Sequence, residues 1–545
     1  MSYIVQFKSI DGEIIGDEID CPVSTTPDQL TTLINHLLEN EDPLPYSFFI
    51  DDVEIVNQLK DTAEEKKLTT EDNITIRFQA QAIFRVRPVT RCGADMPGHT
   101  GSILHSEFSA NGKLLASASG DFTVRLWDLN TNMTKHILKG HTNWVQLASF
   151  SPDCRRLATG AVNSEVFIWD TGSRLTLRKL TGHKKFITGI AWEPFHLNPR
   201  CTRCVTCSKD GTAIIWNVDT GVRVATLGGH TASITCVKWG GNGVVYTGSQ
   251  DRTIKLWDTT RLTSSGSVTM LASLKGHGHW VNSITLCSEH VLRCGPYVPG
   301  EKRQWGEHID KLDRLRQRRI RDIERQTTAR VSSLDKSLGE KEISLKEESV
   351  KKDEEAKPQK TISAATDEFY AAENAILLEL QSIAKKAYDE CIKACGGTEV
   401  FVSCSDDFTL FLWRPSATKR LKKPTARMTG HQQPVNHVLF SPNGLYVASA
   451  SFDHHVKIWN GQTGRFVCSF RGHVGPVYKV AWSSDSRYLV SCSKDSTVKL
   501  WDLAAKKLKT DLPGHADEVF ALDWSPDGSG VVSGGRDKIV KLWKY

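Results

Sequence analysis

The sequence predicts a mainly β protein, in which a small α+β domain precedes a long array of repeated antiparallel sheets. Two observations carry this prediction. A unit that begins with Gly-His and ends with Trp recurs from about residue 98 to residue 545, whereas residues 1–80 contain a different order of strands and one helix. The composition, with 39% hydrophobic and 24% charged residues, is that of a globular chain with enough apolar mass for a sizeable core.

The composition argues against several classes of protein. The first residues lack the basic stretch and apolar run of a secretory signal, and nowhere do about 18 apolar residues follow one another as a membrane-spanning helix requires. The 14 cysteines are scattered rather than grouped as a disulfide framework, which predicts reduced thiols in an intracellular protein. A net charge of +6 is too small to indicate nucleic-acid binding by itself.

Residues 1–80 predict a β-grasp, ubiquitin-like domain. Apolar and polar residues alternate at 4–7 and, after the Asp11-Gly12 turn, at 13–15, which predicts two strands; two more are expected at 47–50 and 74–78. Between them Thr26-Pro27 opens a helix whose apolar residues share one face: Leu30, Leu33, Ile34, Leu37 and Leu38. Because the domain does not end in Gly-Gly, we expect it to dock onto a partner rather than to be conjugated.

The repeat predicts a closed ring of eight blades. Its opening residues are His99, His141, His183, His230, His277, His431, His473 and His515, and its closing residues are Trp127, Trp169, Trp216, Trp257, Trp413, Trp459, Trp501 and Trp543. The spacing from His to Trp is 28 in five of the eight units. A period of about 40–45 residues with Gly-His and Trp-Asp signals is typical of a WD40 β-propeller with four strands per blade.

Each blade also repeats a polar set, which we expect to form a hydrogen-bonded network among buried side chains. In the first blade the set is His99, Ser119, Asp121 and Trp127, and in the seventh it is His473, Ser493, Asp495 and Trp501. A Ser/His/Asp grouping resembles a catalytic triad, but its recurrence in blade after blade indicates a structural role. Asn163 replaces the Asp in the second blade, and Ala161 and Gly535 replace the Ser in the second and eighth, so weaker networks are expected there.

The domain boundaries follow from this repeat. Residues 81–97 are a linker that includes a strand, expected at 82–89, to complete the last blade and close the ring. Residues 98–299 hold the first four blades and the start of the fifth, and residues 396–545 hold the rest. The His-to-Trp spacing of the fifth unit is 136, so we expect residues 300–395 to be a charged insertion, solvated or disordered at 301–360 and an amphipathic helix at 368–394. Its basic part is a candidate RNA contact, although such charge runs are usually just solvated.

Other chemical signals are weak. Cys201, Cys204 and Cys207 imitate a metal-binding run, but they lie in a predicted strand whose alternation sends Cys204 and Cys207 to opposite faces. Cys391 and Cys395 lack further ligands nearby in the sequence. No phosphate-binding loop and no His-Glu-x-x-His motif is present. We therefore expect no enzyme activity and no cofactor of the chain's own.

Several strings resemble the Notchless family of WD-repeat ribosome-assembly factors beyond the general repeat. They are EDPLPYSFFIDDVEIV (41–56), QAIFRVRPVTRC (81–92), LKGHGHWVNS (274–283), CSDDFTLFLW (404–413) and LPGHADEVFALDWSPDG (512–528). The resemblance covers nearly the whole chain except about 300–395. It implies a monomer within a large complex in the nucleus and nucleolus, bound to the precursor of the large ribosomal subunit with its RNA, ribosomal proteins and other assembly factors. It also implies no membrane contact.

The resemblance further implies a partner for the first domain, namely the metal-ion-dependent adhesion site (MIDAS) domain of the AAA ATPase midasin. In that family an acidic residue before the last strand completes the coordination of the partner's Mg²⁺. Glu71 aligns with this residue, and its neighbour Asp72 is the rival. From the sequence alone, Glu71 would be an ordinary solvated turn residue. Carboxylate oxygen is a ligand that Mg²⁺ favours, so the implied Mg²⁺, shared with the partner, is chemically sensible.

The alternative function is that of a substrate receptor of a cullin-type ubiquitin ligase, or a signalling scaffold. Many such receptors carry Trp-Asp-x-Arg at the ends of blades. Here Trp-Asp is followed by Leu-Asn after Asp128, by Thr-Gly after Asp170, by Thr-Thr after Asp258 and by Leu-Ala after Asp502. None of these matches the Trp-Asp-x-Arg pattern, which argues against the ligase-receptor interpretation.

Overall fold

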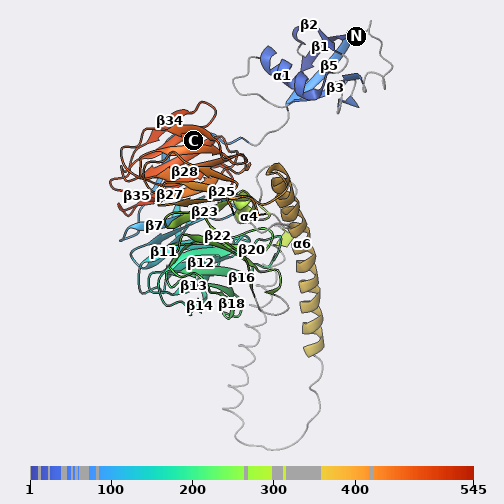
Figure 1. Ribbon diagram of the computed structural model, residues 1–545. Helices are drawn as coiled ribbons and strands as arrows, with labels where there is room; N and C mark the ends of the chain where they lie inside the picture. The colour runs from blue at the N-terminus through green and yellow to red at the C-terminus, as the bar shows by residue number, and fades with distance from the viewer. Residues whose placement is uncertain are drawn as a thin grey trace, which may run out of the picture. The chain divides into compact units, whose positions relative to one another are not determined.

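The computed structural model describes residues 2–9, 14–22, 25–38, 46–50, 53–55, 59–60, 73–80, 85–173, 175–262, 268–297, 311–312, 314, 358–415 and 423–545. It divides into two compact units, Met1–Arg85 and Val86–Tyr545 (Figure 1). In the described ranges, no helix combines the length and the apolar composition that crossing a membrane would require.

The first unit has the strand order of a β-grasp fold. Its elements are β1 (Ser2–Ser9), β2 (Ile14–Pro22), α1 (Pro27–Leu37), β3 (Tyr46–Ile50), β4 (Val53–Glu54) and β5 (Asn73–Ala80). The sheet order is β2-β1-β5-β3-β4, with β1 and β5 parallel at its centre. A capping box between Thr26 and Gln29 begins α1. The apolar face of α1, with Leu30 and Ile34 fully buried, packs with the sheet's buried aromatic and aliphatic side chains into one core.

The second unit is a propeller of four-stranded antiparallel sheets, eight of them in the described residues. The first blade contains β7 (Ile103–Phe108), β8 (Leu114–Ser119), β9 (Thr123–Asp128) and β10 (Met133–Lys139), and the second contains β11 (Val145–Phe150), β12 (Arg156–Ala161), β13 (Val166–Asp170) and β14 (Thr176–Leu180). The third contains β15 (Ile187–Trp192), β16 (Arg203–Ser208), β17 (Ala213–Asn217) and β18 (Arg223–Leu227), and the fourth contains β19 (Ile234–Trp239), β20 (Val244–Ser249), β21 (Thr253–Asp258) and β22 (Thr269–Lys275). The sheets follow one another around the ring in chain order (Figure 1).

The fifth blade contains β23 (Val281–Leu286), β24 (Phe401–Ser405), β25 (Leu410–Trp413) and β26 (Ala426–Met428), and the sixth contains β27 (Val435–Phe440), β28 (Tyr446–Ser451), β29 (Val456–Asn460) and β30 (Phe466–Phe470). The seventh contains β31 (Val477–Trp482), β32 (Tyr488–Ser493), β33 (Val498–Asp502) and β34 (Lys507–Leu512), and the eighth contains β35 (Val519–Trp524), β36 (Val531–Gly535), β37 (Val540–Lys544) and β6 (Arg91–Met96). Each innermost strand contacts that of the next blade, and β35 contacts β7, so the ring is closed.

The closing strand is β6 at 91–96, and the expected position at 82–89 was wrong. Residues 85–90 form no strand, and 81–84 lie outside the described residues. The backbone N–H of Val86 instead donates to Asp485 of the seventh blade at 2.8 Å. The reason for the error is physical. The outermost strand buries only one residue, Met96 in β6 and Leu138 in β10, so strict apolar alternation is the wrong test for it.

Two longer helices lie between β23 and β24 in the described structure: α4 (Glu289–Cys294), which precedes the insertion, and α6 (Pro358–Ala394), which lies in it. The amphipathic helix expected at 368–394 is present and begins ten residues earlier. Its apolar residues Leu377, Leu380 and Ala384 pack against Phe195 and Cys201 of the third blade. The stretch expected to be solvated or disordered, 301–360, lies almost wholly outside the described residues.

Candidate functional site

The repeated polar set forms a buried network, with one residue different from the prediction. In the first blade His99 Nδ1 lies 2.8 Å from the carboxylate of Asp121, and His99 Nε2 lies 2.7 Å from the hydroxyl of Ser117. The Trp127 indole N–H donates to the same hydroxyl at 2.8 Å. The predicted hydroxyl, Ser119, instead donates to the carbonyl of Gly101 and accepts from the Asp121 N–H. Ser119 was therefore the wrong member of this network.

The correction applies around the ring. The hydroxyls that join the imidazole to the indole belong to Ser117, Thr159, Thr206, Thr247, Ser403, Ser449, Ser491 and Ser533, so Ser491 replaces the predicted Ser493 in the seventh blade. The strand register explains this. Trp127 pairs with Leu115, which places Ser117 two residues away and Ser119 four residues away, at about 3.3 Å per residue. Only the nearer hydroxyl reaches the indole.

The network fixes the ionisation of its aspartates. Burial alone would raise the pKa of Asp121, but hydrogen bonds from His99 and Thr123 outweigh it and lower the pKa below the ordinary value. The pKa of Asp495 is lowered in the same way by His473 and Thr497. Because Ser117 is fully buried and already contacts both rings, it has no free face for a substrate. The arrangement stabilises a blade and does not present a nucleophile.

The two blades that depart from the repeat behave differently. In the second, Thr159 joins His141 to Trp169, but the buried Nδ1 of His141 has no hydrogen-bond partner in the described structure. That network is weaker, as expected from Asn163. In the eighth, His515 contacts both Asp537 and Ser533 at 2.6 Å, so the expectation of a weaker network was wrong there. Gly535 occupies the position of Ser119, which is not the position that contacts the indole.

The predicted metal-completing residues, Glu71 and Asp72, lie outside the described residues. The strand that follows them is described. β5 begins at Asn73, beside Ile4 of β1 in parallel register, and it lies between β1 and β3 at the centre of the sheet. Ile74 and Ile76 are buried in the core, so the start of β5 is firmly held. The described structure thus has a fixed strand directly after Glu71 and Asp72 in the sequence.

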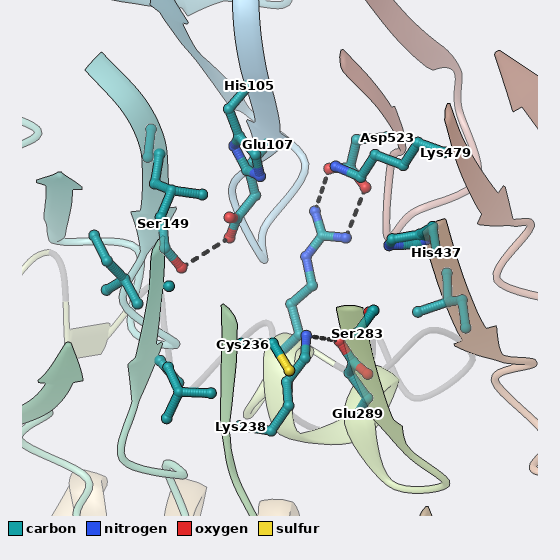
Figure 2. A pocket seen from close by; sticks show the side chains of 18 of the residues that line it. His105, Glu107, Ser149, Cys236, Lys238, Ser283, Glu289, His437, Lys479 and Asp523 are labelled. Carbon is teal, nitrogen blue, oxygen red and sulfur yellow. Dashed lines mark hydrogen bonds and ion pairs between the residues drawn. The ribbon is translucent and has the colours of Figure 1, made fainter. Parts of the chain in front are cut away.

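A second candidate site is the axial channel of the propeller, which no sequence motif indicated. It holds a cavity of about 580 Å³ lined by residues of all eight innermost strands and of α4 (Figure 2). Two charged side chains of α4 reach into it. Arg293 donates to Asp523 of β35 through two nitrogens and to the Phe108 carbonyl, while Glu289 pairs with Lys238 of β19. Since Phe108, Lys238 and Asp523 are near the carboxyl ends of their strands, α4 lies across that end of the channel.

Other charged groups remain in the channel. Glu107 accepts from the Ser149 hydroxyl at 3.4 Å and from the Phe150 N–H at 3.3 Å. Burial raises the pKa of Glu107 to about 7, against the opposing charge of Arg293. Burial also lowers the pKa of Lys479 and lowers the pKa values of His105 and His437 well below the ordinary value. The two imidazoles are therefore neutral near pH 7.

The cysteines do not form a metal site in the described structure. Cys204 and Cys207 are buried in the cores on opposite sides of their blade, as strand alternation predicted. Cys287, at the end of β23, lies beside Cys391 and Cys395, a neighbour that the sequence did not indicate. No group of three or more His, Cys, Asp or Glu side chains in the described ranges is arranged to hold a metal ion.

Family models match both units of the chain. The NLE (NUC135) domain model matches residues 3–63, and the WD domain, G-beta repeat model matches 90–128, 132–170, 175–217, 221–258, 422–460, 464–502 and 506–544. The fifth blade, which is split by the insertion, is the one without a match.

Curated relatives resemble the chain over most of its length. Protein Notchless of Drosophila melanogaster is 41% identical over 434 residues, which are 79% of this chain and 73% of that protein. The chain belongs to the Notchless family. The Notchless protein homolog of Arabidopsis thaliana is 44% identical over 464 residues (85% and 80%), and Ribosome assembly protein 4 of Saccharomyces cerevisiae is 38% identical over 522 residues (86% and 79%).

A solved structure shows the fold alone. The crystal structure of the computationally designed Ika8 protein matches with a TM-score of 0.54 and 22% identity, covering 84% of this chain and all of that one. The Notchless-family chain thus shares its propeller architecture with a protein of unrelated origin, and its function has to be inferred from its relatives and its own side chains.

Proposed function

We propose that this Notchless-family chain is a non-enzymatic assembly factor for the large ribosomal subunit, acting in the nucleus and nucleolus. The observation that carries the proposal is the pairing of an NLE domain with a WD40 propeller, which the chain shares with relatives that include Ribosome assembly protein 4. In this proposal the propeller docks on the precursor particle, and the first unit presents a binding site to an ATPase partner.

The partner in this proposal is the MIDAS domain of midasin, and the contact is a metal bridge. Glu71 would supply a carboxylate oxygen to the partner's Mg²⁺, a hard cation that keeps positions open for oxygen ligands. The strand β5 supports this role, because it begins directly after Asp72 and its buried residues Ile74 and Ile76 anchor it in the core. A carboxylate at the end of a fixed strand loses little conformational freedom on binding.

ATP hydrolysis takes place in the partner, and this chain transmits the force. A pull on the first unit passes through residues 85–90 into β6, the outermost strand of the last blade. The Ser/His/Asp sets support a non-enzymatic role, because the imidazole of each set bonds to its joining hydroxyl and each joining hydroxyl is buried. In this proposal the chain therefore links the ATPase mechanically to the precursor particle.

The decisive experiment measures binding of the full-length protein to a midasin MIDAS domain by calorimetry, with Mg²⁺ and with EDTA. We expect Mg²⁺-dependent binding that Glu71→Ala reduces at least 100-fold. Asp20→Ala, which removes an exposed carboxylate from β2 of the same unit, is the matched control and leaves affinity unchanged.

Two results would change the proposal. Loss of binding in Asp72→Ala but not in Glu71→Ala would move the metal ligand by one residue. Absence of binding by the wild-type protein, together with co-purification with a cullin rather than sedimentation with precursor particles, would favour the ligase-receptor alternative.

A further inference from the structure

The part of the channel away from α4 holds three functional groups at one level. His105, His437 and Lys479 are each the third residue of an innermost strand, in β7, β27 and β31. Equivalent strand positions in a propeller lie at equal height along the axis, so the three side chains line the same section of the cavity. At the same strand position β11, β15, β19 and β23 carry Leu147, Gly189, Cys236 and Ser283, which are small or uncharged.

These three groups lack partners within the described structure. The Nδ1 atoms of His105 and His437 are buried without a hydrogen bond. Asp523 and Glu107 act on Lys479 only through their charge, and no described side chain forms a hydrogen bond with its ammonium group. The other cations of the channel, Arg293 and Lys238, already have carboxylate partners. An unpaired ammonium in a desolvated site is costly, so this level is suited to an anion.

The rim of the cavity is fixed before any ligand arrives. Second-position side chains of the innermost strands hydrogen-bond to the next strand of the ring: Thr188 to the Ile234 carbonyl at 2.6 Å, Asn282 to the Val435 carbonyl at 2.9 Å, and Asn436 to the Tyr478 carbonyl at 2.8 Å. Tyr478 and Phe520, whose rings are 5.4 Å apart, line the same rim. A preformed cavity with an aromatic rim and a few polar groups is the usual form of a small-molecule site.

We propose that the channel binds a small organic acid, with its single carboxylate on Lys479, His105 and His437 and its apolar body against Leu147 and the aromatic rim.

The charges of the lining select a monoanion. The cavity is lined by three basic side chains, Lys238, Arg293 and Lys479, and three acidic ones, Glu107, Glu289 and Asp523. Two ion pairs use four of these groups, which leaves Lys479 and the partly protonated Glu107. With Glu107 in its protonated form, one negative charge balances Lys479, whereas a polyphosphate would meet Glu107 and Asp523 without enough cations. The volume of about 580 Å³ is also far larger than a lone inorganic ion needs.

The test uses ligand-observed saturation-transfer NMR on the full-length protein. The probes are a mixture of aliphatic and aromatic monocarboxylates of about five to ten carbon atoms, and the matched mixture of their primary amides, a size range that suits a cavity of this volume. Inorganic phosphate, inositol hexakisphosphate and capped glutamate peptides are tested by competition. Lys479→Met removes the ammonium while keeping the length of the side chain. Lys507→Met, on the exposed outer strand of the same blade, is its matched control.

We expect saturation transfer to members of the acid mixture and at least tenfold less to their amides. Lys479→Met should reduce the acid signal to that of the amides, and Lys507→Met should leave it unchanged. Equal signals from acids and amides, or acid binding that survives Lys479→Met, would overturn the proposal. Stronger competition by the phosphates or by the capped peptides would also overturn it, in favour of a polyanion or of a protein segment.

Discussion

At the scale of single residues, the choice of hydroxyl in each blade decides how the buried rings are held. Ser117 accepts the Trp127 indole N–H and contacts His99, so two buried nitrogens depend on one oxygen. Ser119 serves only turn backbone groups. Removing a buried partner leaves the desolvation cost of each unsatisfied group, about 1–3 kcal/mol apiece.

Ser117→Ala should therefore destabilise the propeller by about 2–4 kcal/mol, because both ring nitrogens lose their partner. Ser119→Ala, in the same strand and equally buried, should cost about 1 kcal/mol. Urea unfolding followed by tryptophan fluorescence measures the two shifts. Equal shifts, or a larger one for Ser119→Ala, would contradict the assignment of the joining hydroxyl.

The second blade allows a test with pH. Burial lowers the pKa of His141 to about 4, while an unfolded histidine titrates near 6.5. Because the folded pKa is the lower one, the stability contributed by the neutral ring is complete above about pH 6.5 and is lost as the pH falls toward 4, on the order of 3 kcal/mol in all.

Asn163→Asp should give His141 the carboxylate that the other blades have. We expect a gain of about 1 kcal/mol at pH 7, less than a full charged hydrogen bond because Glu165 lies close by. The loss between pH 6.5 and pH 4.5 should shrink. Asp121→Asn in the first blade should do the reverse, and unfolding midpoints at the two pH values compare both variants. A steeper acid loss in Asn163→Asp would refute this account.

At the scale of elements, the strand that closes the ring is the one that departed from its prediction. β6 pairs with β37 from Arg91 to Met96, and Lys541 of β37 reaches Asp95 at 2.6 Å. Residues 85–90 form no strand, but they add the buried side chains of Val86 and Val89 and single hydrogen bonds such as that from the Thr90 N–H to the Lys544 carbonyl.

A protein that begins at residue 90 keeps β6 but loses the buried Val86 and Val89, so it should melt about 5 °C below the wild-type propeller, whereas one that begins at residue 98 should also lose the outer strand and expose β37. Exposed edge strands invite pairing with other chains. We expect the shorter protein to melt at least 10 °C lower or to aggregate, which calorimetry and size-exclusion chromatography would detect. Equal melting of the two proteins would show that β6 does not hold the ring closed.

Particular residues show how far the sequence could predict these elements. The period from His99 to Trp543 predicted the blades, because each unit must bury the same tryptophan in the same way. Ser117 and Ser119 are two residues apart in one strand and therefore lie on the same face of the sheet. Only the pairing of Leu115 with Trp127 shows which of the two hydroxyls is near the indole. His105, His437 and Lys479 look like ordinary solvent-facing strand positions, since the axis that they face exists only after the ring closes.

At the scale of the whole molecule, the two units have separate cores. The core of the first unit contains aromatic side chains, Phe7, Phe48 and Phe78 among them, and among the residues that the structure describes it contains none beyond Phe78. We expect a fragment of residues 1–85 to fold alone, because its hydrophobic residues are satisfied within it.

The measurement is the ¹H–¹⁵N NMR spectrum of this fragment, compared with the full-length protein. Dispersed signals that overlay those of the intact chain are expected. Phe48→Ala, which removes a fully buried ring, should collapse the dispersion, since such truncations cost about 3–5 kcal/mol. A fragment without dispersion would show that the first unit needs the propeller in order to fold.

The pairing that closes the last blade joins the first described strand of the propeller to be synthesised to the last one. β6 leaves the ribosome before any other described strand of the propeller, and its partner β37 is the last described strand of the ring to be made. β6 therefore has no partner until β37 has been synthesised, and until then the nascent chain carries an unpaired strand edge. A premature stop that removes only β37 would leave β6 and β36 without the strand that lies between them. The truncated protein would then expose two unpaired strand edges, which promote aggregation.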